Sequence, residues 1–480
     1  MPEAYKGPLE QIDACRWRIP RSCREDMRVD GIIYADEKLM RSIVSDKSPE
    51  QVANVATLPG IVGASLAMPD IHWGYGFCIG GVAATDPQQG GVISPGGVGY
   101  DINCGVRLMR TALTQKQVQP RIERLIDALF ANVPCGVGRD GKHVYKRKEL
   151  ARILEGGSAV VVEQGLGWPD DIEATEAHGR LNDADPDAVS DRAYERGKAQ
   201  CGTLGSGNHF LEVQVVETVF DEPAAEALGL AMGQIAVMIH SGSRGLGYQV
   251  CDESLHALRG VPAKYGITLP DRQLACAPVD SKEGRRYLGA MRAAANYAWA
   301  NRQILTHLAR ETFADVFDAS AESLEMGLVY DVAHNIAKIE SYEIGGQPRM
   351  LCVHRKGATR AFPPGHPEVS ARYRAVGQPV LIPGDMGRAS YVLVGQPAAM
   401  TDTFGSACHG AGRRMSRSAA IRAATGRRID QGLLSQGIVA RARGRTGLAE
   451  EQPDAYKDVS QVVEVVHCAG LARKVARLRP

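Results

Sequence analysis

Apolar and polar positions alternate in several short stretches of the chain, and each stretch predicts a β-strand. Residues 210–219 (FLEVQVVETV) alternate with a period of two, whereas 235–240 (IAVMIH) are apolar almost throughout, as in a fully buried strand. Residues 31–130 alternate short apolar runs with glycine turns, which favours β structure early in the chain. Three later apolar runs also predict strands: MLCVH at 350–354, PVLIP at 379–383 and SYVLVG at 390–395.

Two stretches follow a helical period instead. Residues 115–132 place four apolar side chains on one face: Ile122, Leu125, Ile126 and Leu129. The longest predicted helix spans 283–317. Because strands and helices interleave without an internal repeat or low-complexity linker, we expect a mixed α/β (α+β) fold that forms a single integrated domain over residues 1–480.

One acidic segment stands apart from this pattern. Residues 163–195 contain WPDDIEATEAHGR and NDADPDAVSD, which predict a helical or looped excursion. We expect this excursion to be a solvated surface within the domain.

Composition restricts the environment and the partners. The 56 Lys and Arg residues nearly balance the 55 Asp and Glu residues, so a polyanion site must be local. The eleven cysteines are spread from Cys15 to Cys468 without the dense spacing of a secreted disulfide framework, which fits a reducing cytosol. No apolar run approaches the roughly 18 residues of a membrane span. We expect a soluble, cytoplasmic protein.

Glycines gather around the histidines, and 53 of the 480 residues are glycine. This is above the usual share of about 7% and predicts tight turns around a shared site. Three glycine-rich stretches, 96–99, 202–207 and 242–247, could direct backbone N–H groups toward phosphates. GVGRDGK at 136–142 matches most of a Walker A loop, but His143 replaces the required Ser or Thr, so we reject it.

Five residues indicate a metal centre. Asp101 and Cys104 lie in GGVGYDINCGVRL, and His209, His240 and His334 each stand where an apolar strand meets a turn. Asp101 and Cys104 alone would more often be structural, but five such residues together favour metal ligation. Thiolate and imidazole suit zinc while carboxylate suits manganese or magnesium, so the residue types leave the metal open.

His409 in FGSACHGAGRRMSRS is the best candidate for a covalent nucleotide carrier, because the chain has no Lys-x-Asp-Gly stretch that would supply a lysine nucleophile. Its small neighbours leave room for a phosphorus atom: Gly410, Ala411 and Gly412. Arg413 and Arg414 follow at once and can stabilise phosphate charge.

Positive charge is concentrated near this histidine. Between Gly410 and Arg445 there are nine arginines and one carboxylate, Asp430, which predicts part of a polyanion site. A solvated arginine-rich helix is the alternative. Cations elsewhere extend the predicted RNA or phosphate site: Arg244, and Arg355, Lys356 and Arg360 in HRKGATR.

These motifs together resemble the RtcB family of RNA ligases through nearly the whole chain, from MPDIHWGYGFCIGG at 68–81 to AYKDVSQVVEVVHCAG at 455–470. The stretches PGGVGYDINCGVR, GTLGSGNHFLEV, HSGSRGLG, VYDVAHN, HRKGATRAFPPG and SACHGAGR resemble family signatures in their expected order. The resemblance implies β-sheets around a metal-binding cleft with peripheral helices.

The resemblance also implies a mechanism. Two Mn²⁺ ions, with Zn²⁺ as another occupant, would be held by five ligands, with Cys104 bridging: Asp101, Cys104, His209, His240 and His334. His409 would take a guanylate from GTP and pass it to an RNA 3′-phosphate, itself derived from a 2′,3′-cyclic phosphate. A 5′-hydroxyl end would then displace GMP. The implied partners are tRNA halves or broken RNA, in tRNA splicing or RNA repair, and an archease-type activator.

Family positions around the nucleotide match a further set of residues: Asn208, Phe210, Glu212, Asn335, Asp385, Ser390, Gly410, Ala411, Gly412, Arg413 and Tyr456. Family members often carry serine at the position of Asp385, so this carboxylate alters the expected contact with the nucleotide. They also commonly end in a tail with a lysine near the guanine, whereas this sequence ends at Arg479 and Pro480.

Two other functions are compatible with parts of this pattern. A metal-dependent cyclic phosphodiesterase or phosphoesterase would need the two metals but no covalent histidine. An RNA-binding protein with structural metals would use the arginine-rich region alone. The second leaves the grouping of Cys, Asp and His residues unexplained.

Overall fold

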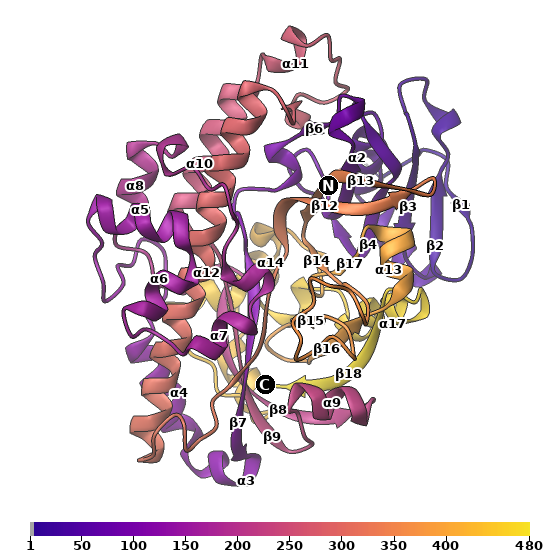
Figure 1. Cartoon of the computed structure of the whole chain (residues 1–480). Coiled ribbons are helices and arrows are strands. Elements are labelled where there is room, and N and C mark those ends of the chain that lie inside the picture. Colours follow the sequence, from indigo (N-terminus) through magenta and orange to yellow (C-terminus); the bar gives the residue numbers. More distant parts are fainter. Residues whose placement is uncertain (1–3) are drawn as a thin grey trace.

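The computed structural model describes residues 4–480, and two seven-stranded sheets form its centre (Figure 1). The first sheet is antiparallel except for one parallel pair, β3 with β4. Its strands, in spatial order, are β1 (Glu10–Gln11), β2 (Arg16–Ile19), β3 (Asp30–Tyr34), β4 (Ile61–His72), β5 (Ile79–Thr85), β13 (Gln347–Lys356) and β12 (Asn335–Ile344).

The second sheet is antiparallel throughout. Its strands, in spatial order, are β11 (Leu328–Ala333), β7 (Gly105–Thr114), β9 (Gln234–Ser241), β8 (Phe210–Val219), β18 (Ala472–Arg479), β16 (Ser390–Gly395) and β15 (Pro379–Ile382). Two short ladders complete the β structure: β6 (Val92–Ile93) with β10 (Ala277–Pro278), and β14 (Ala358–Arg360) with β17 (Ser406–Cys408).

Helices cover the second sheet, and the long helix α12 (Lys282–Phe317) runs down one side of the molecule with several shorter helices around it (Figure 1). The others are α1 (Glu37–Ile43), α2 (Ser48–Val55), α3 (Gln115–Val118), α4 (Ile122–Asn132), α5 (Arg147–Gly156), α6 (Ser158–Glu163), α7 (Pro169–Glu173), α8 (Asp191–Gly197), α9 (Glu222–Leu228), α10 (Arg244–Leu258), α11 (Val261–Lys264), α13 (Pro397–Thr403), α14 (Arg417–Ala423), α15 (Ile429–Leu434), α16 (Arg445–Glu450) and α17 (Val459–Cys468). No helix in residues 4–480 combines the length and the apolar character needed to cross a membrane.

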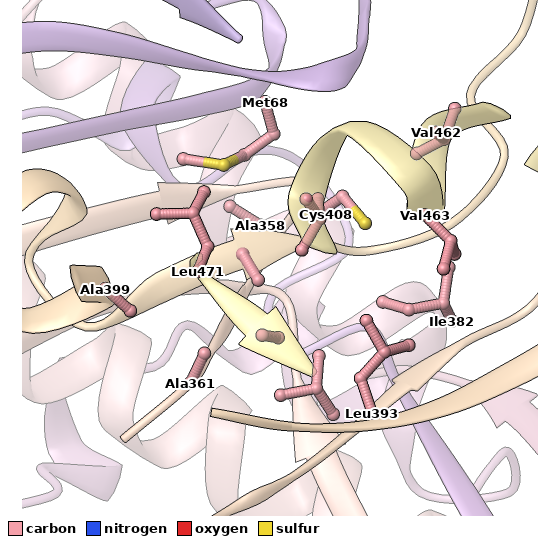
Figure 2. Packing of buried hydrophobic residues seen from close by; sticks show 14 of the residues in the cluster. Met68, Ala358, Ala361, Ile382, Leu393, Ala399, Cys408, Val462, Val463 and Leu471 are labelled. Atoms are coloured by element: carbon pink, nitrogen blue, oxygen red, sulfur yellow. The ribbon is translucent and has the colours of Figure 1, made fainter. Parts of the chain in front are cut away.

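The largest hydrophobic core draws side chains from both sheets. Leu66 and Val82 of the first sheet and Val106 and Met238 of the second belong to one buried cluster. Figure 2 shows part of this cluster around β14, β17 and α17, with Cys408 lying among apolar side chains that include Val463 and Leu471. Burial of each large apolar side chain stabilises the fold by about 1.5–3 kcal/mol. The packing around Cys408 therefore fixes its position, and with it the backbone position of the next residue, His409.

The strands and helices expected from periodicity are confirmed, and the fold is of the mixed α/β class. Strands β8, β9, β13, β15 and β16 cover the predicted stretches, and α12 covers 283–317. The helix predicted at 115–132 is interrupted by a 3₁₀ turn at Gln119–Arg121, because Pro120 has no N–H to continue the α-helical ladder. Helices α1 and α2 were not predicted within 31–130.

Part of the segment 163–195, expected to be an exposed excursion, lies in the interior. Asp171 and Glu176 are buried in this segment, where each carboxylate is paired. Asp171 accepts two hydrogen bonds of 2.7 Å from Arg310 of α12, and Glu176 accepts one of 2.6 Å from Lys338 of β12. The acidic composition therefore includes internal partners of buried cations as well as surface charge.

One disulfide joins distant parts of the chain. Cys15, beside β2, is bonded to Cys468 at the end of α17, across a sequence separation of 453 residues. The remaining nine cysteines are free. Nothing in the cysteine spacing predicted this pair.

Candidate active site

The register of the second sheet brings four of the five predicted metal ligands to one end of it. Gly105 of β7 pairs with Ala333 of β11 and with Ser241 of β9, and Phe210 of β8 pairs with His240. The ligands occupy or adjoin these paired positions: Cys104 before β7, His209 before β8, His240 in β9 and His334 after β11.

The donor atoms of these side chains converge. Cys104 Sγ lies 3.3 Å from His209 Nε2 and 3.2 Å from His240 Nε2. His240 Nε2 lies 3.2 Å from His334 Nε2, and Asp101 Oδ2 lies 2.9 Å from His209 Nε2. All five predicted ligands thus form one cluster.

The chemistry of the cluster fits a metal ion. Ligand atoms of Cys104, His209 and His240 all lie within 4.8 Å of one another, and the separations above match donors about 2.0–2.3 Å from a shared ion. Burial holds the pKa of His240 and that of His334 well below the ordinary value, so both rings are neutral and their lone pairs are free. Nδ1 of His209 and Nδ1 of His334 are buried without a hydrogen-bond partner.

A buried ion network supports the turn that carries Asp101 and Cys104. Asp331 of β11 accepts from Arg107 Nε at 2.7 Å and from Arg302 Nε at 2.8 Å. Arg302 also donates to the carbonyl of Asn103 at 2.7 Å, and Asn103 has a positive φ of 51°. Arg302 of α12 therefore holds the loop backbone, so the core positions the ligands.

His409 lies beside this cluster. It follows β17, whose Cys408 pairs with Ala358 of β14, and its ring centroid is 4.9 Å from that of His334. The side chain is 13% exposed, which leaves it accessible to a ligand. A Cβ on Gly357 would lie 3.0 Å from His409 Cε1, so this glycine leaves room for the ring.

Asp70 is a site residue that the sequence analysis missed. It is fully buried at the end of β4, and its Oδ2 lies 2.5 Å from His409 Nδ1. The same oxygen accepts the backbone N–H groups of His409 and Gly410 at 3.0 and 3.2 Å. The signal was present: Asp70 is the one carboxylate in the apolar run SLAMPDIH, where an unpaired charge would be costly.

Lys457 supports Asp70 from behind. Its buried ammonium donates to the carbonyls of Pro69 and Ile71, the two neighbours of Asp70. Burial lowers the pKa of Lys457 to about 8, and Asp70 partly offsets this. Because the lysine contacts both flanking carbonyls, it fixes the backbone from which the carboxylate of Asp70 reaches His409.

The residues predicted around a nucleotide divide into two groups next to His409. In the first, Gln214 Nε2 donates to Glu212 at 2.7 Å and to Ser390 Oγ at 3.0 Å, which links β8 to β16. Asp385 lies near Glu212 and is paired with Arg388 at 3.1 Å; burial raises the pKa of Asp385, and Arg388 offsets this only in part. Burial raises the pKa of Glu212 to about 7.

The second group contains Arg413, which follows His409 in the chain, and Tyr456. Arg413 Nη1 donates to Glu451 at 2.9 Å and to Tyr456 Oη at 3.1 Å. A Cβ on Gly412 would lie 2.2 Å from the carbonyl oxygen of Asp70, so glycine is required there. The remaining predicted positions adjoin the cluster in sequence or through the backbone: Asn208, Phe210, Asn335, Gly410 and Ala411.

Two of the cations predicted to contact RNA or phosphate, Arg355 and Arg360, lie in the interior, and their contacts with RNA stay predictions. Arg355 is fully buried and forms two hydrogen bonds to Glu340, of 2.9 and 2.8 Å. Arg360 is 1% exposed and is bonded to Gln378 and Glu368. Both residues point into the core because their acidic and amide partners compensate them there.

The other predicted cations have different surroundings. Lys356 is 5% exposed, and its ammonium donates to three carbonyls, of Tyr75, Phe77 and Gly96, which uses all its protons. Arg244 begins α10 and donates to Thr203 Oγ1 at 3.1 Å, and Arg414 is exposed. Contacts of these three with RNA stay predictions.

Known proteins resemble this chain over almost its full length. Residues 51–480 match the family model described as tRNA-splicing ligase RtcB. A tRNA-splicing ligase RtcB from Thermococcus kodakarensis is 55% identical over 473 residues, which cover 98% of each chain. One from Archaeoglobus fulgidus is 55% identical over 475 residues, covering 99% of this chain and 98% of the relative. An RNA-splicing ligase RtcB from Mycobacterium tuberculosis is 54% identical over 432 residues, covering 90% of this chain and 98% of the relative.

Proposed function

Because the chain belongs to the tRNA-splicing ligase RtcB family, we propose that it is an RNA ligase that uses GTP and Mn²⁺ to join 3′-phosphate or 2′,3′-cyclic phosphate ends to 5′-hydroxyl ends. The single observation that carries the mechanism is the position of His409. Its ring is accessible, is oriented by a buried carboxylate, and lies 4.9 Å from a ring of the metal-ligand cluster.

Asp70 prepares His409 as a nucleophile. Asp70 Oδ2 lies 2.5 Å from Nδ1, which favours the tautomer that carries its proton on Nδ1 and leaves the lone pair of Nε2 free to attack. Nε2 forms a bond to the α-phosphorus of GTP while the bond to pyrophosphate breaks. The positive charge that then develops on the ring is stabilised by Asp70, as a buried carboxylate stabilises imidazolium in other histidine-dependent enzymes.

The cluster would hold the metal ions of this reaction. We assign Cys104, His209 and His240 to one Mn²⁺ ion and Asp101, Cys104 and His334 to the other, and the same donors would also accept Zn²⁺. Bound there, the ions would supply Lewis-acid stabilisation of phosphoryl charge.

The guanylate then moves to RNA. The 3′-phosphate oxygen of one strand attacks the phosphorus on His409, the P–N bond breaks, and Nε2 recovers its lone pair. The 5′-hydroxyl of the second strand attacks the activated 3′-phosphate, and GMP leaves. Glu212, Ser390 and Asp385 on one side and Arg413 and Tyr456 on the other are proposed to hold the nucleotide.

The first test is labelling of the protein with α-labelled GTP in the presence of Mn²⁺. We expect acid-labile label on the wild-type chain and on His256→Ala, a control at an exposed histidine of α10, and none on His409→Ala. Label retained by His409→Ala would contradict the assignment of the nucleophile.

Product analysis separates ligation from hydrolysis of phosphoesters. With RNA that carries a 2′,3′-cyclic phosphate and RNA that carries a 5′-hydroxyl, a ligase yields sealed RNA and GMP. Release of free 3′-phosphate RNA as the sole product, with no GTP consumed, would favour the metal-dependent phosphoesterase instead.

A further inference from the structure

Arginine side chains lie over three glycines in and next to the loop that leads to His209 of the metal-ligand cluster. Gly136, Gly205 and Gly207 all have positive φ, of 107°, 101° and 73°. A Cβ on Gly205 would lie 2.3 Å from the guanidinium of Arg244, and one on Gly207 would lie 2.9 Å from that of Arg417. The absence of side chains at these glycines makes room for the arginines.

The glycine at 136 continues this arrangement away from the cluster. A Cβ on Gly136 would lie 3.0 Å from Arg443 Cδ and 3.7 Å from Arg139 Cγ, so two arginines from distant segments meet over one glycine. Gly136 N donates to Gly205 O at 2.7 Å, and Leu204 N donates to Pro134 O at 2.8 Å. The rejected Walker-like segment, 136–142, is therefore attached directly to the loop that ends in His209.

Arg139 and Arg443 differ from most arginines around them. Both are exposed, and neither has an ion pair or hydrogen bond from its guanidinium within residues 4–480. By contrast, Arg441 pairs with Asp127 at 2.7 Å and Arg417 pairs with Glu450 at 2.7 Å. Two exposed arginine side chains that meet over one glycine, with no carboxylate paired to either within residues 4–480, favour binding of an anion.

We propose that Arg139 and Arg443, together with Arg244, form a phosphate-binding track that holds the sugar-phosphate backbone of single-stranded RNA as it approaches the metal-ligand cluster. This rests on the proposed RNA ligase activity. The guanidinium groups contact backbone phosphates and no base, so the track is independent of RNA sequence. It extends the site from the loop that carries His209 to the surface formed by 136–142 and 441–445.

The test compares two double variants with the same change in charge. Arg139→Ala with Arg443→Ala removes the outer track, whereas Arg285→Ala with Arg286→Ala removes two exposed arginines from the first turn of α12. Those lie 15 or more residues before Asn301, which contacts the 202–203 backbone, and so about 22 Å or more away along the helix.

Binding of a 5′-hydroxyl single-stranded RNA oligonucleotide is measured at several salt concentrations. The track predicts that Kd rises about tenfold in the Arg139/Arg443 variant and that the slope of log Kd against log salt falls by about 1.4, since each single-strand phosphate contact contributes about 0.7. The Arg285/Arg286 variant should bind like the wild type. Arg139→Lys with Arg443→Lys should retain most of the salt slope, because the charges remain.

The same preparations are labelled with GTP and Mn²⁺, a step that needs no RNA. Normal labelling with weakened RNA binding supports the track. Normal labelling with unchanged Kd and salt slope overturns the track and leaves the ligase proposal standing, whereas wild-type protein that binds RNA but takes no label contradicts the ligase mechanism. Equal loss of binding in both double variants would also overturn the track, since net charge alone would explain it.

Discussion

Asp70 determines which nitrogen of His409 is available for chemistry. Asp70→Asn keeps the size of the side chain but allows its amide to donate to Nδ1, which would place the ring proton on Nε2 and block attack. We expect the rate of GTP labelling to fall by about 10²- to 10⁴-fold, as in enzymes where a histidine takes the wrong tautomer.

Binding of GTP and Mn²⁺ to the Asp70→Asn variant distinguishes positioning from collapse of the site. Both affinities should stay close to wild type, measured by equilibrium dialysis, because Asp70 is not among the proposed ligands. A variant that binds both and labels at the normal rate would show that the contact with His409 has no part in catalysis.

At the residue scale, the sequence predicts well which side chains form the metal-ligand cluster. It predicts less well whether a given arginine lies on the surface or in the core. Five ligand candidates converge as expected, since four stand at the ends of adjacent strands and Asp101 lies in the turn before β7. The burial of Arg355 and Arg360 was not predictable, because the sequence does not show that Glu340 and Glu176, 15 and 184 residues away, would meet them inside the fold. Asp70 was missed because its partner is 339 residues distant.

Among the elements, the acidic segment 163–195 contributes to the core through Glu176, which begins a 3₁₀ turn at Glu176–Gly179. Its carboxylate is 2.6 Å from Lys338 Nζ and 3.8 Å from Arg360 Nε, and it accepts the N–H of Ala333, the residue before His334. Glu176→Gln leaves the buried Lys338 without the carboxylate it contacts and removes one of the two carboxylates beside Arg360, so it should destabilise the fold by about 3–5 kcal/mol.

Urea unfolding measures this change. Glu173→Gln in the same segment is the control: Glu173 is exposed, and its contact with His178 is 4.0 Å long. The control should change stability by less than about 0.5 kcal/mol. Similar changes in the free energy of unfolding for the two variants would mean that the buried contacts of Glu176 do not stabilise the fold.

The same residue predicts a pH dependence. Burial alone would raise the pKa of Glu176, but Lys338 and Arg360 lower it to about 2, from an ordinary value of 4.5. A lowered carboxyl pKa stabilises the folded state above pH 4.5, and this contribution is lost as the pH falls from 4.5 through about 2. Wild-type stability should therefore fall more steeply over this range than that of Glu176→Gln.

Element types were predictable where one period dominated. Strand β8 alternates with a period of two, β9 is apolar almost throughout and α12 is long, so their predicted positions were correct. The single break at Pro120 was missed because apolar spacing continues across it. Helices α1 and α2 were missed because glycine turns and short apolar runs around them favoured strands.

In the whole molecule, the Cys15–Cys468 disulfide restrains the two ends of the fold against each other. Closing so long a loop reduces the number of conformations open to the unfolded chain. Cys468→Ser removes this restriction and should lower the free energy of unfolding by about 2–4 kcal/mol. Thermal unfolding with and without a reductant tests this: reductant should lower the Tm of the wild type and leave that of Cys468→Ser unchanged. Cys23→Ser, at a free cysteine, should behave like the wild type.

Strand β18 has a consequence for synthesis of the protein. It is formed by Ala472–Arg479, yet it lies in the middle of the second sheet, between β8 and β16. A nascent chain from which β18 has not yet emerged would therefore present β8 and β16 as open edges, and open edges are prone to pairing with other chains. The half-built sheet must wait for residues 472–479, so slow translation of the stretch between β16 and β18 would prolong an aggregation-prone state.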